Sequence, residues 1–262
     1  MLKFNERKRN IFLEIAYDGT NYHGFQRQSP PLNAIQNILE SKLQKIFGEK
    51  IELAAAGRTD AGVHACGQVV NFFTNGTIPI EKIPLAASSL LPNDIVILNA
   101  KEVDKNFHAR YDAKSKIYIY RLLIGEVSDP FINRYAWHIR NDLDVEAMKS
   151  ALNILIGKND FSAFKAASNV KMNPVREIFS ADIKEITENN YPLPITHYQL
   201  QIKIHADGFL YHMARNIVSS VVNVGRGRYS IEDFKRIFES RDRNNAAPTA
   251  PPQGLCLLKV FY

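Results

Sequence analysis

Residues 54–73 read AAAGRTDAGVHACGQVVNFF, and this stretch decides how the rest of the chain is interpreted. One apolar run ends at Ala56, a second covers Val69–Phe73, and two glycines bound the polar segment between them. Such a pattern is typical of a strand, a tight loop and a second strand. Glycines also leave room for a large molecule to approach the backbone. We therefore predict a loop that presents Arg58 and Asp60 side by side.

The first half of the chain predicts the β-α-β-β-α-β order of a ferredoxin-like unit around this loop. Apolar residues at helical spacing before Gly48 indicate the first helix, and Pro84 limits the second. In chain order, we expect a strand over Ile11–Tyr17, a helix over Asn33–Phe47, the two strands beside the loop, a mostly helical stretch over Ile80–Leu91 and a strand over Asp94–Val103.

The second half predicts the same order without repeating the sequence. We expect a strand over Ser115–Ile124, a helix over Asp144–Ile156, strands over Val175–Ile186 and His197–His205, helices over Phe209–Val224 and Ser230–Glu239, and a strand over Leu255–Tyr262. The fold class is thus α+β, with two ferredoxin-like halves over residues 1–110 and 111–262. We expect their sheets to join into one mostly antiparallel platform with a central cleft, which the loop of Asp60 would overhang.

The composition describes a globular protein with a basic surface. Hydrophobic residues make up 45% of the chain and charged residues 23%, and the formal net charge of +6 is compatible with a polyanionic partner such as nucleic acid. A solvated face is the alternative explanation for any one basic cluster. The clusters are Lys3, Arg7, Lys8 and Arg9; Arg110, Lys114 and Lys116; and Arg226, Arg228, Lys235, Arg236, Arg241 and Arg243.

Cysteine usage and hydropathy indicate the compartment. Cys66 and Cys256 match no disulfide framework or metal-ligand spacing. The first ten residues lack the apolar segment of a signal peptide, and no apolar run reaches membrane-spanning length. We therefore expect a cytoplasmic protein without a membrane segment.

The carboxylate of Asp60 stands out because the common catalytic motifs are absent. The sequence contains no P-loop, HExxH, GxSxG or paired-cysteine motif, and its histidines show no ligand spacing. A lone carboxylate is poorly suited to hydrolysis, which uses an acid and a base. One ionised carboxylate suffices as a covalent nucleophile when a cation keeps it deprotonated. Asp60 is therefore a candidate nucleophile, although an aspartate beside an arginine in a turn is often only a surface pair.

Tyr118 is a second candidate, because its strand also contains Tyr120 and an aromatic face can stack on a nucleobase. Packing in the core is the equally weighted alternative from the pattern.

The segment Gly57–Ala65, GRTDAGVHA, resembles the signature of the tRNA pseudouridine synthase A family. Phe25 stands where that family often has tryptophan and Cys256 where tyrosine is usual, but neither departure touches the signature. Supporting segments follow in the family's order over almost the full length: Tyr17–Tyr22, Gly24–Gln28, Phe107–Arg110, Tyr118–Arg121, Asp160–Phe164, Pro174–Ile178 and Phe209–Asn216.

This resemblance implies an isomerase that converts uridine to pseudouridine at positions 38 to 40 of the tRNA anticodon stem-loop. It implies a homodimer and no metal, nucleotide or redox cofactor. Asp60 would be the nucleophile, Tyr118 would lie against the target uracil, and Arg58 would help to hold the extruded nucleotide. Arg215 would be the ion-pair partner of Asp60. The rim that meets the RNA backbone would comprise Phe107, His108 and Arg110.

Three rival functions stay open, and one of them is a pseudouridine synthase of the same fold that acts on another RNA. A non-catalytic RNA-binding protein with the same fold would bind tRNA regardless of Asp60. A hydrolase is disfavoured because a second carboxylate and metal ligands are missing.

Overall fold

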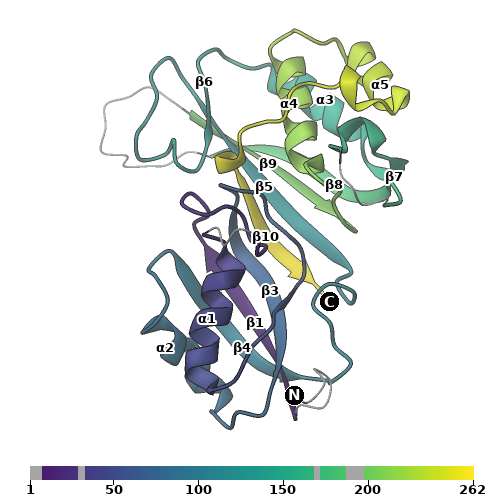
Figure 1. Cartoon of the computed structure of the whole chain (residues 1–262). Helices are drawn as coiled ribbons and strands as arrows, with labels where there is room; N and C mark the ends of the chain where they lie inside the picture. The colour runs from purple at the N-terminus through teal and green to yellow at the C-terminus, as the bar shows by residue number, and fades with distance from the viewer. Residues whose placement is uncertain (1–7, 29–32, 168–171, 187–197) are drawn as a thin grey trace. The chain divides into compact units, whose positions relative to one another are not determined.

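The computed structural model describes residues 8–28, 33–167, 172–186 and 198–262, and Figure 1 shows their arrangement in each part of the chain. The chain forms two compact units, Met1–Lys114 with Leu257–Tyr262 and Ser115–Cys256. Each combines helices with mostly antiparallel strands, which confirms the predicted α+β class. In the described part of the chain, no helix is long and apolar enough to cross a membrane.

The first unit is built on a sheet with the order β4-β1-β3-β10. Strand β1 is antiparallel to β3 and to β4, and β2 is antiparallel to β3. The β-α-β-β-α-β order is as predicted, and β10 is added to it. The elements are β1 (Arg9–Tyr17), α1 (Ile35–Phe47), β2 (Ala54–Ala55), β3 (His64–Thr74), η2 (Ile80–Lys82), α2 (Ile83–Ser88), β4 (Ile95–Val103) and β10 (Leu255–Phe261).

Strand register places the apolar residues of β1 and β3 on one face of this sheet. Leu13 lies opposite Val70 and Ile11 opposite Phe72, and all four are fully buried. Helix α1 covers this face, with the ring of Phe47 edge-on to Phe72 at 5.3 Å between centroids (Figure 1). The helix ends as predicted at Gly48, whose φ of 68° and N–H bond to the preceding turn form a glycine C-cap.

Two buried asparagines tie the segment after β4 to the sheet. Asn71 donates to Asn10 Oδ1 at 2.9 Å and accepts from the N–H of Ala109 at 2.8 Å. Asn10 in turn donates to the carbonyls of Asp104 and Phe107, each at 2.9 Å. Both asparagines are 1% exposed, so these bonds are shielded from water and costly to lose.

The second unit has the strand order β5-β9-β8-β7 with antiparallel neighbours, and β6 runs parallel to β5. Helix α3 packs against α4 and β8. The elements are β5 (Ser115–Ile124), β6 (Trp137–Ile139), α3 (Val145–Ile154), β7 (Gly157–Asp160), η3 (Ser162–Phe164), β8 (Val175–Ile186), β9 (Tyr198–Ala206), α4 (Met213–Gly225), α5 (Ile231–Ser240), η4 (Arg243–Asn245) and η5 (Pro252–Gly254).

Local capping signals in this unit are confirmed. Asp144 caps α3 by accepting from the N–H of Ala147, and Ser230 with Asp233 forms the predicted capping box of α5. Strands β5 and β8 have their predicted bounds.

Several predicted boundaries were wrong for identifiable reasons. Helix α4 begins at Met213 rather than Phe209, because His212 is left-handed with a φ of 60° and ends the preceding turn. Strand β3 extends back to His64, and the short strands β6 and β7 were not predicted. Residue 197 of the expected strand lies outside the described residues. The joining of the two sheets and the cleft between them stay predictions.

Replacing Asn71 tests the asparagine network. Asn71→Ala leaves the Ala109 N–H and Asn10 Oδ1 without this partner, so we expect the free energy of unfolding to fall by about 2–4 kcal/mol. Asn99→Ala is the matched control, because Asn99 is an exposed residue of β4 and its loss should cost less than about 0.5 kcal/mol. Urea denaturation compares the two, and equal midpoints would show that the network contributes nothing.

Candidate active site

The signature loop lies between β2 and β3 and ends in a tight turn that starts at Asp60. The N–H of Val63 donates to the carbonyl of Asp60 at 3.1 Å, and Gly62 has a φ of 77°. A positive φ at the third position defines a type II turn, which explains the glycine there. The turn leaves Asp60 half-buried and Arg58 exposed. Arg58 and Asp60 therefore come from one loop, as predicted, but the side chain of Arg58 is more exposed to solvent than that of Asp60.

The segment around Gly24 packs directly on the backbone of this loop. The N–H of Phe25 donates to the carbonyl of Thr59 at 3.0 Å. A Cβ on Gly24 would lie 2.8 Å from that carbonyl oxygen, and the φ of 87° also favours glycine. The hydroxyls of Thr59 and Tyr17 are 2.8 Å apart in a buried hydrogen bond. Thr59, the residue before Asp60, is thus held through its carbonyl by Phe25 and through its hydroxyl by Tyr17.

The turn after β1 supports the other end of the loop. A Cβ on Gly19 would lie 2.0 Å from the carbonyl oxygen of Val63, a distance at which no side chain fits. The N–H of Gly19 donates to His64 Nδ1 at 3.1 Å, and Asp18 Oδ1 lies 3.1 Å from the same nitrogen. His64 is 6% exposed. The histidine of the signature is therefore a buried anchor for the neighbouring turn.

Tyr22 also contacts the signature loop and connects it to Asp94. Its carbonyl accepts from the N–H of Gly62 at 3.4 Å, and its hydroxyl donates to the carboxylate of Asp94. Burial, followed by the bond to Asp94, raises the pKa of Tyr22 well above its ordinary value, so the phenol stays protonated.

Gln68 is a supporting residue that sequence reasoning missed. It is fully buried in β3, donates through Nε2 to the carbonyl of Gly57 at 2.9 Å and accepts from the N–H of Val69 at 3.1 Å. The available signal was a polar residue inside an apolar strand, because a buried amide has to be hydrogen-bonded.

The predicted rim residues are two half-buried side chains, Phe107 and His108, and the exposed Arg110. The ring of Phe107 lies 5.8 Å from Phe12 and 5.0 Å from Tyr262, on the sheet face opposite α1. His108 accepts the N–H of Arg110 at 3.1 Å through Nδ1, and Arg110 is exposed. The guanidinium of Arg110 lies over the ring of Tyr111, 6.0 Å from its centroid, and the imidazole of His108 lies 4.3 Å from the centroid of the same ring.

Tyr118 and Arg215 belong to the second unit and come from different elements. Tyr118 lies opposite Ile204 on the helix-covered face, is 8% exposed and meets the ring of Phe209 edge-on at 4.8 Å. Arg215 lies in the first turn of α4, half-buried, and donates through Nε to the carbonyl of Ala250 at 2.8 Å. Their roles toward a substrate stay predictions.

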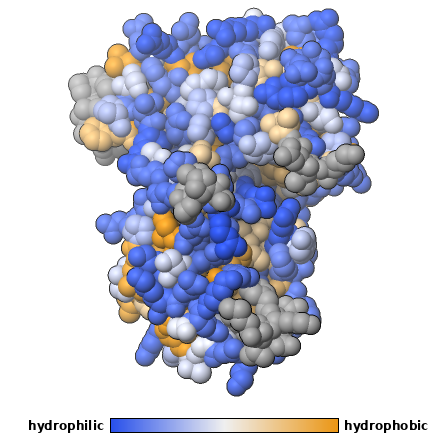
Figure 2. Space-filling view, viewed as in Figure 1, coloured by the Kyte–Doolittle hydropathy of each residue, from blue (hydrophilic) through white to orange (hydrophobic). Residues whose placement is uncertain are grey.

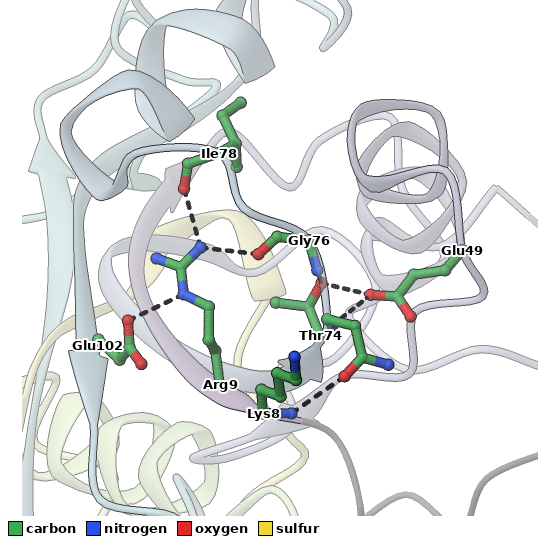
Figure 3. Close-up of polar contacts among 8 residues, drawn as sticks. Lys8, Arg9, Glu49, Thr74, Gly76, Ile78 and Glu102 are labelled. Carbon is green, nitrogen blue, oxygen red and sulfur yellow. Dashed lines mark hydrogen bonds and ion pairs between the residues drawn. The ribbon is translucent and has the colours of Figure 1, made fainter.

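The basic clusters are not uniformly available to bind phosphates. Arg9 donates to Glu102 and to the carbonyls of Gly76 and Ile78, each at 2.9 Å, and so ties β1 to its neighbours (Figure 3). Around α5, the surface is largely hydrophilic (Figure 2). The exposed basic residues there are Arg228, Lys235, Arg236 and Arg241. Lys3 and Arg7 lie outside the described residues.

Within the described ranges, no group of three histidine, cysteine, aspartate or glutamate side chains is arranged to hold a metal ion.

Comparison with known proteins shows similarity along nearly the whole chain. A family model described as tRNA pseudouridine synthase matches residues 14–112 and 151–262. The tRNA pseudouridine synthase A of Thermoanaerobacter sp. (strain X514) is 44% identical over 254 residues, which cover 97% of this chain and 100% of that protein. The tRNA pseudouridine synthase A 2 of Clostridium perfringens (strain 13 / Type A) is 43% identical over the same shares. Among solved structures, an archaeal box H/ACA sRNP Nop10-Cbf5 complex matches with a TM-score of 0.34 and 9% identity, covering 81% of this chain and 44% of that chain.

Gly19→Ala tests the support of the loop. The added methyl group cannot fit against Val63, so we expect the loop to move and unfolding to become easier by about 2–4 kcal/mol. Trypsin cleavage after Arg58 should accelerate in the same variant. Gly48→Ala is the control, because its Cβ meets no atom within 4 Å and only its positive φ costs about 1 kcal/mol. Equal cleavage rates in both variants would contradict the packing role.

Proposed function

The chain belongs to the tRNA pseudouridine synthase family, and we propose that it isomerises uridine to pseudouridine at positions 38 to 40 of the tRNA anticodon stem-loop. The observation that carries this proposal is the family match across both units, which includes the whole signature loop. The packing of that loop supports it, because three neighbouring segments hold the backbone around one half-buried carboxylate.

In this reaction, the bond from C1′ to N1 of the uridine breaks, the uracil turns, and C1′ bonds to C5. The hydrogen on C5 then leaves as a proton and N1 gains a proton, so the product is an isomer of the substrate. Asp60 acts as the nucleophile, at C1′ or at C6, or promotes a glycal route. Covalent catalysis needs an ionised group whose position is preorganised. The contacts on Thr59 and Val63, the neighbours of this turn, supply that rigidity.

The other site residues have roles that follow from their surroundings. Arg58 is exposed at the loop and fills the space of the extruded nucleotide, since chemistry on a paired base requires extrusion at a cost of about a few kcal/mol. Tyr118 stacks on the target uracil, with Phe209 holding its ring edge-on. Arg215 pairs with Asp60 and keeps it ionised.

The partners extend beyond the reacting nucleotide. His108 and Arg110 meet the RNA backbone, while Phe107 fixes their segment to the sheet. The exposed arginines and lysine around α5 bind phosphates in a salt-dependent manner.

We also propose a cytoplasmic homodimer in which one tRNA contacts both subunits. A monomeric mass of the protein, measured by sedimentation in the presence of tRNA, would contradict the homodimer.

Asp60→Asn is the decisive variant. The amide has the shape of the carboxylate but is not a nucleophile, so pseudouridine formation should fall by at least about 1,000-fold while tRNA affinity is retained. Three anticodon stem-loops, each with uridine at only one of positions 38, 39 and 40, report which positions are modified. Asp182→Asn, an exposed change on β8, is the control and should keep full activity.

Retained turnover in Asp60→Asn would exclude this residue as the nucleophile. Binding without pseudouridine in the wild-type protein would favour the non-catalytic RNA-binding alternative.

Tyr118→Phe separates the ring from its hydroxyl. The ring keeps its contact with Phe209, so binding of the stem-loop should survive while kcat falls by up to about tenfold, the effect of one hydrogen bond. Tyr118→Leu removes the aromatic face and about 1–3 kcal/mol of stacking, so its loss should be larger. Tyr135→Phe is the control in the same unit. A Tyr118→Leu variant with normal kcat and KM would assign this residue to the core alone.

A further inference from the structure

The guanidinium of Arg215 is held by a segment that runs beside α4, residues 243–251, which we call the strap. The contact is the 2.8 Å bond from Arg215 Nε to the carbonyl of Ala250. It uses one of the five N–H donors of the guanidinium and sets the plane in which the others point. The orientation of this cation therefore depends on where the strap holds the Ala250 carbonyl.

Asn216, the residue after Arg215, fastens the strap to the same helix. Its Oδ1 accepts from Thr249 Oγ1 at 2.7 Å and from Arg243 Nη2 at 3.1 Å, and its Nδ2 donates to the carbonyl of Phe164 at 2.8 Å. Asn216 is fully buried, and its bond to Phe164 is buried as well, while the bonds to Thr249 and Arg243 are part-buried.

Arg243 and Tyr120 hold the two ends of the strap. Arg243 donates through Nη1 to the carbonyl of Ala246 at 3.1 Å and through Nη2 to Thr249 Oγ1 at 3.3 Å. Burial lowers the pKa of the Arg243 guanidinium, so its removal from water has a cost that these bonds offset. At the other end, Tyr120 donates to the carbonyl of Pro251 at 2.7 Å.

We propose that Asn216, Thr249 and Arg243 are positioning residues that set the orientation of Arg215 through the carbonyl of Ala250. This inference rests on the proposed function, in which Arg215 keeps Asp60 ionised. A long arginine side chain loses about 2 kcal/mol of rotamer entropy when it is fixed. The strap fixes the Arg215 side chain before the substrate binds, so the cost of fixing it does not add to the barrier of the reaction.

A double-mutant cycle on Thr249 and Arg215 separates positioning from simple stability. Thr249→Val keeps the shape and removes the hydroxyl that holds Asn216, so kcat for the stem-loop should fall by about tenfold with KM within about twofold. In the Arg215→Lys background, which lacks the Nε donor, the same change should lower kcat by less than about twofold. Thr249→Ser, which restores a hydroxyl, should recover most of the activity.

Thr74→Val is the matched control, because Thr74 is a fully buried threonine whose hydroxyl donates to Glu49 in the other unit, and it should keep the wild-type kcat and KM. Arg243→Lys provides a second variant if Thr249→Val does not fold, and it should show the same dependence on Arg215.

Equal losses of kcat from Thr249→Val in the wild-type and Arg215→Lys backgrounds would overturn the proposal, because a purely structural strap acts independently of Arg215. Full activity of Arg215→Lys would also overturn the positioning proposal. The proposed reaction would still stand in that case if Asp60→Asn, measured in parallel, loses turnover. The two failures are thereby distinguishable.

Discussion

The loop that carries Asp60 depends on the close approach of two backbones, that of Gly19 and that of Val63. No side chain fits between them, because a Cβ on Gly19 would lie 2.0 Å from the Val63 carbonyl oxygen. Gly24 makes a similar approach to the carbonyl of Thr59 from the other side. The two glycines therefore fix the backbone on either side of Asp60, whose half-buried carboxylate lies in this turn.

Buried amide side chains perform the same task at three separate loops. Gln68 supports the signature loop, Asn71 holds the segment that ends in His108 and Arg110, and Asn216 fastens the strap. An amide offers both donors and acceptors, so it can satisfy irregular backbone that no strand or helix pairs. Each of these loops is thereby connected to a regular element by a neutral side chain.

The proposed machinery is divided between the two compact units. The proposed nucleophile, Asp60, and the proposed rim residues come from the first unit, and Tyr118 and Arg215 come from the second. In each unit, the proposed residues are anchored by contacts within that unit. Phe107 packs on Phe12 and Tyr262, while Tyr118 meets Phe209. The proposed isomerisation of uridine is therefore supported in two independent ways, by the family relationship and by the local packing around the proposed residues in each unit.

The sequence by itself determined the α+β class, most element bounds, the caps at Asp144 and Ser230, and the membership of the family, because periodicity, capping and motif order are local properties of the chain. It also singled out Asp60, since the glycines around it mark an unusual turn. Only the tertiary structure decided that His64 and Gln68 are anchors, that Arg9 is tied to carbonyls, and that α4 starts after His212. Those outcomes depend on partners far away in the chain and on backbone that no local pattern specifies.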